Sequence, residues 1–249
     1  TRRTMVLDAG RVPLSGVINA SNRLAGMDGL LDIKNIRGIT AFKAWGAYPA
    51  IAFTENDRHM AWMFYNTGSL ESPVWNLVKL GGNAYVPADG AGASTWFREP
   101  TGIAAYPAAF SLTYPGFGAY DANFIYIADR GNKKIKLMTV MRFKDAPYTG
   151  VINTVSSDYA TLGETPQGIA MAGTTLYVST MEGNIYKITT ATFMTPTAVT
   201  KMTSSGISNL HGLASDGTTL FYAAGQKTYK VGVNQDPSTQ SVSLIASTD

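Results

Sequence analysis

The side chains that could carry chemistry are few. The chain has two histidines and no cysteine, which excludes disulfides, iron–sulfur clusters, thiolate sites and a zinc centre built from three histidines. Asp and Asn oxygens could still hold calcium, an ion that takes about six to eight oxygen ligands from loops. We therefore expect no metal and no cofactor, with calcium as the alternative.

The remaining catalytic signals are weak. The sequence contains no serine elbow, no phosphate loop and no paired-carboxylate spacing. His211 stands directly before Gly212 and is a weak candidate for a general base, although a lone histidine is more often a surface or hydrogen-bonded residue. Asp89 and Asp129 stand in turn sequences, where a carboxylate accepts backbone N–H bonds. This supply of groups favours a protein without catalytic activity.

The elements that position these residues are repeated hairpins. Residues 123–138 predict a strand, a turn at Asp129–Asn132 and a second strand that alternates Lys with apolar residues. The same pattern recurs after Gly38, Gly102, Gly168 and Gly212, each followed by apolar or small residues. The last two glycines are separated by about one propeller blade, roughly 40 to 50 residues. A first strand therefore begins at each glycine. We expect second strands at 60–65, 124–128, 175–180 and 220–224, third strands at 74–80, 134–141, 185–189 and 228–233, and fourth strands at 151–155, 198–202 and 242–246.

Two inserts lengthen the first two units. They follow the first strand, from Phe42 onward and from Tyr106 to Tyr120, and equivalent loops of neighbouring units should lie side by side. Their aromatic residues either form an interface or cap the core. The candidate interface residues are Phe42, Trp45, Tyr48, Tyr106, Tyr114, Phe117 and Tyr120. Tyr126, Tyr177 and Tyr222 are expected at one core position of the second strand.

The N-terminus echoes a later part of the repeat. Pro13-Leu-Ser-Gly-Val-Ile-Asn19 resembles Pro147-Tyr-Thr-Gly-Val-Ile-Asn153, which joins a third strand to a fourth. By that register, residues 3–7 and 16–20 are the outer two strands of a blade whose first two strands are missing. The chain is expected to begin in the middle of a blade.

The best-preserved unit resembles the repeat of NHL-type β-propellers. The matching residues are Ala88-Asp89-Gly90-Ala91-Gly92, Phe97, Pro100-Thr101-Gly102-Ile103-Ala104, Ile125 to Asn132 and Lys134-Ile135. The resemblance implies an all-β, NHL-like propeller of about five blades, four complete and one partial, that forms a single domain over residues 1–249. It also places Gly-Ile-Ala on the innermost strand. At the channel mouth it gathers Thr101, Arg130, Gln167 and His211, together with the acidic residues Asp28, Asp89, Glu99, Asp129 and Glu164. Related propellers with lyase or lactonase activity hold a metal there.

The partners are narrowed by charge and hydropathy. A net charge of +3 is small and scattered, so nucleic-acid binding is not expected. No apolar run reaches the ~18 residues of a membrane span, and no signal peptide opens the chain. The first residue is Thr1 rather than Met, so the chain is either exported and trimmed or excised from a longer one. We expect an extracellular or periplasmic location. Asn19 is the single glycosylation sequon, with its neighbours Ala20 and Ser21.

Two functions follow as hypotheses. The first is a non-catalytic extracellular binding and assembly module, whose partner is a protein, in particular copies of itself. The partial blade would then be completed by strands of a neighbour, giving a homo-oligomer or a fibril-like scaffold. The second is a calcium-type propeller lyase or lactonase with its site at the channel mouth and His211 as base.

Overall fold

Four antiparallel sheets of four or five strands and one two-stranded sheet make up the described part of the protein. The computed structural model describes residues 6–7, 12–13, 35–69, 71–82, 96–114, 118–147, 150, 152–192, 194–203, 210–225, 227–233 and 243–247. Within these ranges the regular elements are β-strands, apart from the short 3-10 helix η4 (Arg130–Asn132). This confirms the all-β prediction. No helix in the described part of the chain is long and apolar enough to cross a membrane.

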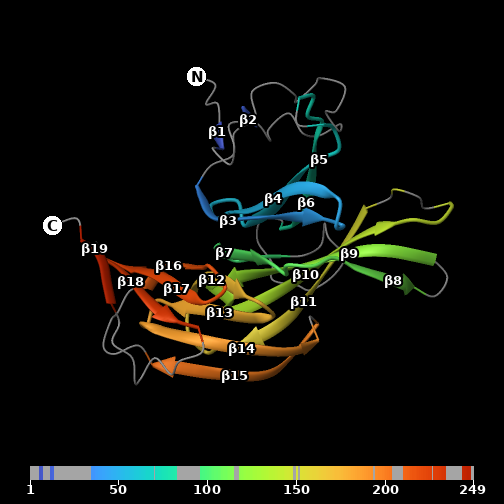
Figure 1. Ribbon diagram of the computed structural model, residues 1–249. Helices are drawn as coiled ribbons and strands as arrows, with labels where there is room; N and C mark the ends of the chain where they lie inside the picture. Colours follow the sequence, from blue (N-terminus) through green and yellow to red (C-terminus); the bar gives the residue numbers. More distant parts are fainter. Residues whose placement is uncertain are drawn as a thin grey trace.

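The four larger sheets are arranged as the four blades of a β-propeller (Figure 1). Blade 1 contains β3 (Ile36–Ala44), β4 (Tyr48–Glu55), β5 (Met60–Asn66) and β6 (Trp75–Gly81). Blade 2 contains β7 (Pro100–Ala105), β8 (Phe110–Tyr114), β9 (Gly118–Asp129), β10 (Lys134–Phe143) and β11 (Ile152–Thr161). Blade 3 contains β12 (Pro166–Ala172), β13 (Thr175–Thr180), β14 (Asn184–Thr192) and β15 (Thr195–Thr203). Blade 4 contains β16 (Leu210–Ser215), β17 (Thr219–Ala224), β18 (Lys227–Gly232) and β19 (Ser243–Ser247).

The inner strands are the ones that the glycine pattern predicted. β3, β7, β12 and β16 carry Gly38, Gly102, Gly168 and Gly212, and they pack on one another in that order. Glycine is required at these positions by close approach: a Cβ added to Gly102 would lie 2.7 Å from both the Gln167 oxygen and the Ile169 nitrogen of β12. At Gly168 it would lie 2.7 Å from the Leu213 nitrogen of β16. Each of these glycines thus seats the backbone of the next inner strand.

Blade 1 differs from the prediction. Residues 48–55, expected as part of an insert, form the second strand β4, so that residues 60–65 lie in the third strand and 74–80 in the fourth. The reason is a tight turn at residues 45–47, where Trp45 and Gly46 both have positive φ, 50° and 74°. That conformation is typical of two-residue hairpin turns. The predicted loop is therefore a β3–β4 hairpin.

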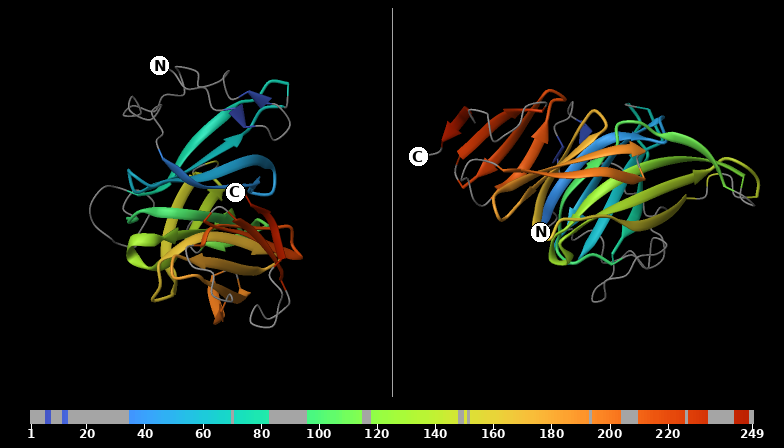
Figure 2. Two further views of the ribbon diagram at one scale, coloured as in Figure 1. Left: turned by 90° about the vertical axis from the view of Figure 1, so that its left-hand side faces the viewer. Right: turned by 90° about the horizontal axis from the view of Figure 1, so that it is seen from below.

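In blade 2 the insert extends the sheet. β7 pairs with the end of β9, from Ile125 to Asp129, and β8 pairs with its beginning, from Gly118 to Ala122. The predicted strand 124–128 is therefore the second half of a twelve-residue strand. The long strands of this blade project beyond the other blades (Figures 1 and 2).

A short antiparallel pair lies near the N-terminus. β1 (Val6–Leu7) pairs with β2 (Val12–Pro13), with Val6 opposite Pro13. The pair lies beyond blade 1, on the side away from blade 2 (Figure 1). β1 falls within the predicted strand 3–7, whereas its partner β2 precedes the predicted strand 16–20, which lies outside the described residues.

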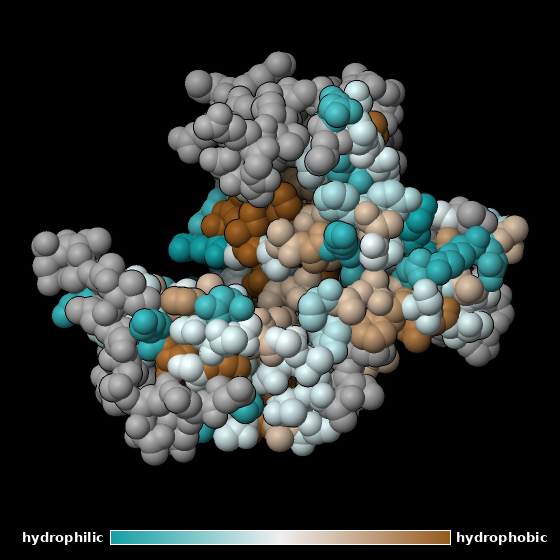
Figure 3. Space-filling model, in the orientation of Figure 1, coloured by the Kyte–Doolittle hydropathy of each residue, from teal (hydrophilic) through white to brown (hydrophobic). Residues whose placement is uncertain are grey.

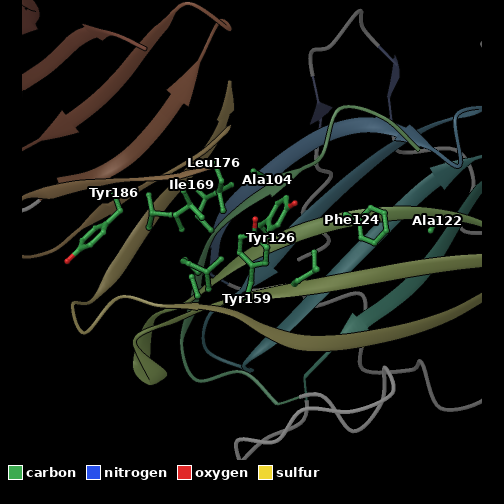
Figure 4. Packing of buried hydrophobic residues seen from close by; sticks show 14 of the residues in the cluster. Ala104, Ala122, Phe124, Tyr126, Tyr159, Ile169, Leu176 and Tyr186 are labelled. Carbon is green, nitrogen blue, oxygen red and sulfur yellow. The ribbon is translucent and has the colours of Figure 1, made fainter. Parts of the chain in front are cut away.

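Each blade has two packing faces. We call the face toward the following blade the leading face and the opposite one the trailing face. In blade 3, Tyr177, Ile185 and Met202 lie on the leading face and join a cluster with blade 4. Ile169, Leu176 and Val178 lie on the trailing face and pack with Tyr126 and Phe124 of blade 2 (Figure 4). The hydrophobic core is therefore divided into layers between blades.

The tyrosines of the second strands do not all share one position. Tyr126 pairs with Ala104, and Tyr177 with Ala170, so both rings are on the leading face. Tyr222 pairs with Leu213, the counterpart of Ile169, and therefore lies on the trailing face, while Phe221 is the true equivalent of Tyr177. The prediction was wrong by one residue for Tyr222, because Phe and Tyr are adjacent there and only the register distinguishes them.

Candidate functional site

Three of the four predicted channel-mouth residues occupy one repeated backbone feature. Every inner strand has a β-bulge near its start, where the register shifts relative to the second strand. In β7, β12 and β16 the bulge contains Thr101, Gln167 and His211, each directly before its glycine. In β3 the equivalent residue is Arg37. Bulges commonly re-aim a side chain at functional sites.

These four side chains differ in how accessible they are. Arg37 and His211 are exposed and Gln167 is half-buried, whereas Thr101 is buried and its Oγ1 donates to the Pro166 carbonyl at 3.3 Å. Thr101 therefore joins β7 to β12. Arg37 was missed at the sequence level, although its place before Gly38 was the available signal. The accessible side chains at these bulge positions are thus an arginine, a histidine and an amide.

Arg130, the fourth predicted residue, connects two blades. It lies in η4, and its guanidinium lies 3.4 Å from the Glu99 carboxylate. Its Nη2 also donates to the Met181 sulfur at 3.2 Å, in the turn after β13. Glu99 has a positive φ of 53°, an uncommon conformation for a residue with a side chain. These contacts hold the turn of blade 2 against blade 3.

The acidic and histidine residues near the mouth have structural partners. The Asp129 carboxylate is buried and accepts from the Arg98 backbone N–H and from Asn132 Nδ2, both at 2.7 Å. Burial raises the pKa of Asp129, and these hydrogen bonds only partly oppose the shift. His59 lies in the turn between β4 and β5, and its Nδ1 accepts from the Glu99 N–H at 2.9 Å.

Glu164 is likewise engaged. Its carboxylate accepts from Thr180 Oγ1 at 2.8 Å, from Asn184 Nδ2 at 2.9 Å and from Lys201 Nζ at 2.6 Å. Burial acts to raise its pKa, but hydrogen bonds from Lys201, Asn184 and Thr180 outweigh it, so the pKa lies below its usual value. Among the described residues, no three His, Asp or Glu side chains are grouped to hold a metal ion. Asp28 and Asp89 lie outside those residues.

The aromatic residues of the first insert pack against blade 2. Trp45 is buried, its backbone N–H donates to Asn123 Oδ1 at 2.6 Å and its indole N–H donates to the Val140 carbonyl at 3.1 Å. Tyr48 and Phe42 are partly buried beside the same cluster. The Arg142 guanidinium lies 5.8 Å from the Trp45 ring centroid and 5.2 Å from that of Tyr48. Trp45 therefore serves the contact between blades.

The aromatic residues of the second insert are distributed along blade 2. Tyr120 is buried, and its ring centroid lies 5.8 Å from that of Phe143. Tyr106 is partly buried, and its ring centroid lies 5.5 Å from that of Phe110. Tyr114 belongs to β8, and Phe117 lies outside the described residues, as does Asn19. The rings of Trp45 and Tyr120 are thus in the core, and the partly buried rings of Phe42, Tyr48 and Tyr106 lie at its margin.

An uncovered surface lies at the two ends of the row of inner strands. On β3, the trailing side carries Ile39, which is 50% exposed, whereas its equivalents Ile103 and Ile169 are 4% and 5% exposed. On β16, the leading side carries Gly212 and Ala214, both exposed, and a Cβ added to Gly212 would meet no atom of the described residues within 4 Å. Apolar side chains gather over β3, beside the notch between blades 1 and 4 (Figure 3). Sequence reasoning missed this surface.

Comparisons with known proteins give no family. No family model and no curated protein matches the sequence. Among solved structures, human WBSCR16 is 9% identical, with a TM-score of 0.39 over 85% of this chain and 67% of its own. A functionally unknown protein from Desulfotomaculum acetoxidans is 12% identical, with a TM-score of 0.36 over 85% and 69%. The PQQ-bound aldose sugar dehydrogenase from Streptomyces coelicolor is 12% identical, with a TM-score of 0.31 over 87% and 85%. These values are too low to carry an argument about fold or function.

Proposed function

We propose that this protein is a non-catalytic binding and assembly propeller whose partner is a protein, namely further copies of itself. The observation that carries the proposal is the exposure of Ile39, 50% against 4% and 5% at the equivalent Ile103 and Ile169. The isoleucines of β7 and β12 are buried between blades, whereas the isoleucine at the same position of β3 is exposed to solvent. Exposed apolar surface at a position built for packing is typical of an interface.

The number and type of blades form part of this proposal. We propose an NHL-like propeller of about five blades, of which the fifth is partial and includes the β1–β2 pair. The pairing of Val6 with Pro13 supports a hairpin at the N-terminus, and the echo between residues 13–19 and 147–153 supports its place in the repeat. Strands from a neighbouring copy would complete this blade and give a homo-oligomer or fibre. The proposed location is extracellular or periplasmic.

The experiment is a mass measurement. We expect sedimentation velocity over a wide concentration range to show species heavier than the 26.6 kDa chain. Replacing Ile39 with aspartate should shift the distribution toward the single chain, because a carboxylate at a packed apolar position must be desolvated. A strict monomer at every concentration would contradict the assembly function.

The calcium-dependent lyase or lactonase is the competing function. Its acidic ligands would have to come from residues such as Asp28 and Asp89, together with His211 as base. A calcium titration followed by calorimetry separates the two functions: the assembly module shows no heat of binding, and chelation leaves its melting temperature unchanged. A stoichiometric calcium site would favour the enzyme.

A further inference from the structure

From the packing of the inner strands we infer that β16 of one copy lies on the trailing side of β3 of the next, as an additional step in the row of blades. This inference rests on the proposed assembly function but gives it a different contact: the complete blade 4 of a neighbour, rather than separate strands that complete a partial blade, would cover the trailing side of blade 1. The first surface is the leading side of β16, with Gly212 and Ala214. The second is the trailing side of β3, with Ile39 and Ala41.

The spacing of backbones within the chain supports this pairing. A Cβ on Gly38 would meet the Thr101 oxygen and the Ile103 nitrogen, and one on Gly102 would meet the Gln167 oxygen and the Ile169 nitrogen. In both cases the glycine seats the carbonyl before the next glycine and the N–H after it. By the same relation, Gly212 would seat the Arg37 carbonyl and the Ile39 N–H of a second copy. Of these four glycines, Gly212 is the one where no atom of the described residues occupies that space.

Exposure supports the same pair of surfaces. All six residues of β7 are buried, because this strand has an inner strand on each side. On β3, by contrast, Ile39 and Ala41 are exposed, and on β16 Gly212 and Ala214 are exposed. Each end strand therefore lacks a neighbouring inner strand on one side: β3 on its trailing side and β16 on its leading side. A second copy supplies the matching side to each.

The residues on the two surfaces fit a contact between inner strands. Ile39 occupies the position of Ile103, which is buried in the layer between blades 1 and 2. On blade 4, Phe221 occupies the position of Tyr177, a ring buried in the layer between blades 3 and 4. Ile39 of one copy would thus pack toward Phe221 of another, as Leu213 does toward the cluster of Tyr177. A contact between two different surfaces is heterologous, so it generates rings or fibres.

The test uses one variant on each surface. Gly212→Val adds a side chain where the described part of this chain has no atom within 4 Å, so the single chain should keep its melting temperature. Ile39→Asp places a charge on the other surface, and Val199→Asp, at an exposed position of the outer strand β15, is its matched control. We expect each of the first two variants to weaken association about tenfold or more in sedimentation velocity, and the control to leave it unchanged.

Mixing the two variants gives the decisive result. The Gly212→Val copy keeps a normal β3, and the Ile39→Asp copy keeps a normal β16, so together they should form a 1:1 particle that neither forms alone. If Ile39→Asp dissociates the particles while Gly212→Val does not, and mixing restores nothing, the β16–β3 contact is wrong although assembly itself stands. A loss of melting temperature in the Gly212→Val single chain would show that β16 is covered within its own chain and would also overturn the inference. A wild-type chain that stays monomeric refutes both assembly and contact.

Discussion

The buried carboxylate of Asp129 allows a quantitative prediction about stability. Its two oxygens accept from the Arg98 N–H and from Asn132 Nδ2, each at 2.7 Å, and the Gly131 N–H returns a bond to the Arg98 carbonyl at 2.8 Å. Asp129→Ala removes both acceptors and leaves the Arg98 N–H to find water. Since Arg98 is partly accessible, we expect a loss of about 1 to 2 kcal/mol in the free energy of unfolding. For a chain of this size, that corresponds to roughly 2 to 8 °C in melting temperature.

The pH dependence gives the same residue a second, independent signature. Burial raises the pKa of Asp129 in the folded state, so the folded chain holds this proton to higher pH than the unfolded chain. The stabilisation from the neutral form is complete below the unfolded pKa, near 3.9, and is lost as the pH rises through the folded value. Asp129→Asn should remove this decline, because the amide does not titrate. Urea unfolding across the acidic range measures both effects.

Asp216 is a matched control, because its effect on the pH dependence of stability has the opposite sign. Asp216 is exposed, and hydrogen bonds from the N–H groups of Thr218 and Thr219 lower its pKa. Its contribution is present above the unfolded pKa and is lost as the pH falls through the folded value, so Asp216→Asn should flatten the curve in the other direction. If Asp129→Asn leaves the pH profile unchanged and Asp129→Ala costs less than about 0.5 kcal/mol, the reading of Asp129 as a buried, turn-fixing carboxylate is refuted.

Three further substitutions test contacts between and within blades. Tyr177→Phe removes a 2.8 Å bond to the Val233 carbonyl between blades 3 and 4, and urea unfolding should show a loss of about 1 to 2 kcal/mol. Gly102→Ala should cost about 1 to 3 kcal/mol in the same assay, because its Cβ would press on the backbone of β12; an unchanged midpoint would contradict that close approach. Glu164→Gln should make the free energy of unfolding depend less on pH in the acidic range. The pKa of Glu164, with Lys201 beside it, is lowered in the folded chain, so its contribution to stability is lost as the pH falls through the folded pKa. An unaltered acid profile would argue against this ion pair.

The inner strands were predictable because their constraint is local. Gly followed by small or apolar residues recurs wherever one backbone must approach another, and this pattern located β3, β7, β12 and β16. The bulge that aims Thr101, Gln167 and His211 was partly visible as well, since these residues precede the glycines. Arg37 carries the same signal and was overlooked.

The strand order of blade 1 could not be read in the same way. Ala47-Tyr48-Pro49-Ala50 and Ala105-Tyr106-Pro107-Ala108 are identical, yet the first enters β4 and the second bridges β7 and β8. Pro disfavours a central strand, and only the turn at Trp45 decides the first case. The exposure of Ile39 was equally hidden, because Ile103 and Ile169 have the same local sequence. It depends on which strands have neighbours, and neighbours are a property of the whole fold.

The order of contacts between the inner strands, β3–β7–β12–β16, has a consequence for how the molecule unfolds locally. In the described part of the chain, β7 and β12 are each held from both sides, whereas β3 and β16 are each held by one adjacent inner strand. Stability then accumulates through nearest neighbours, as in repeat proteins, and local opening begins where one neighbour is absent. Amide hydrogens of the last blade should exchange with solvent before those of blade 2, and the protein would lose its structure from the margins inward.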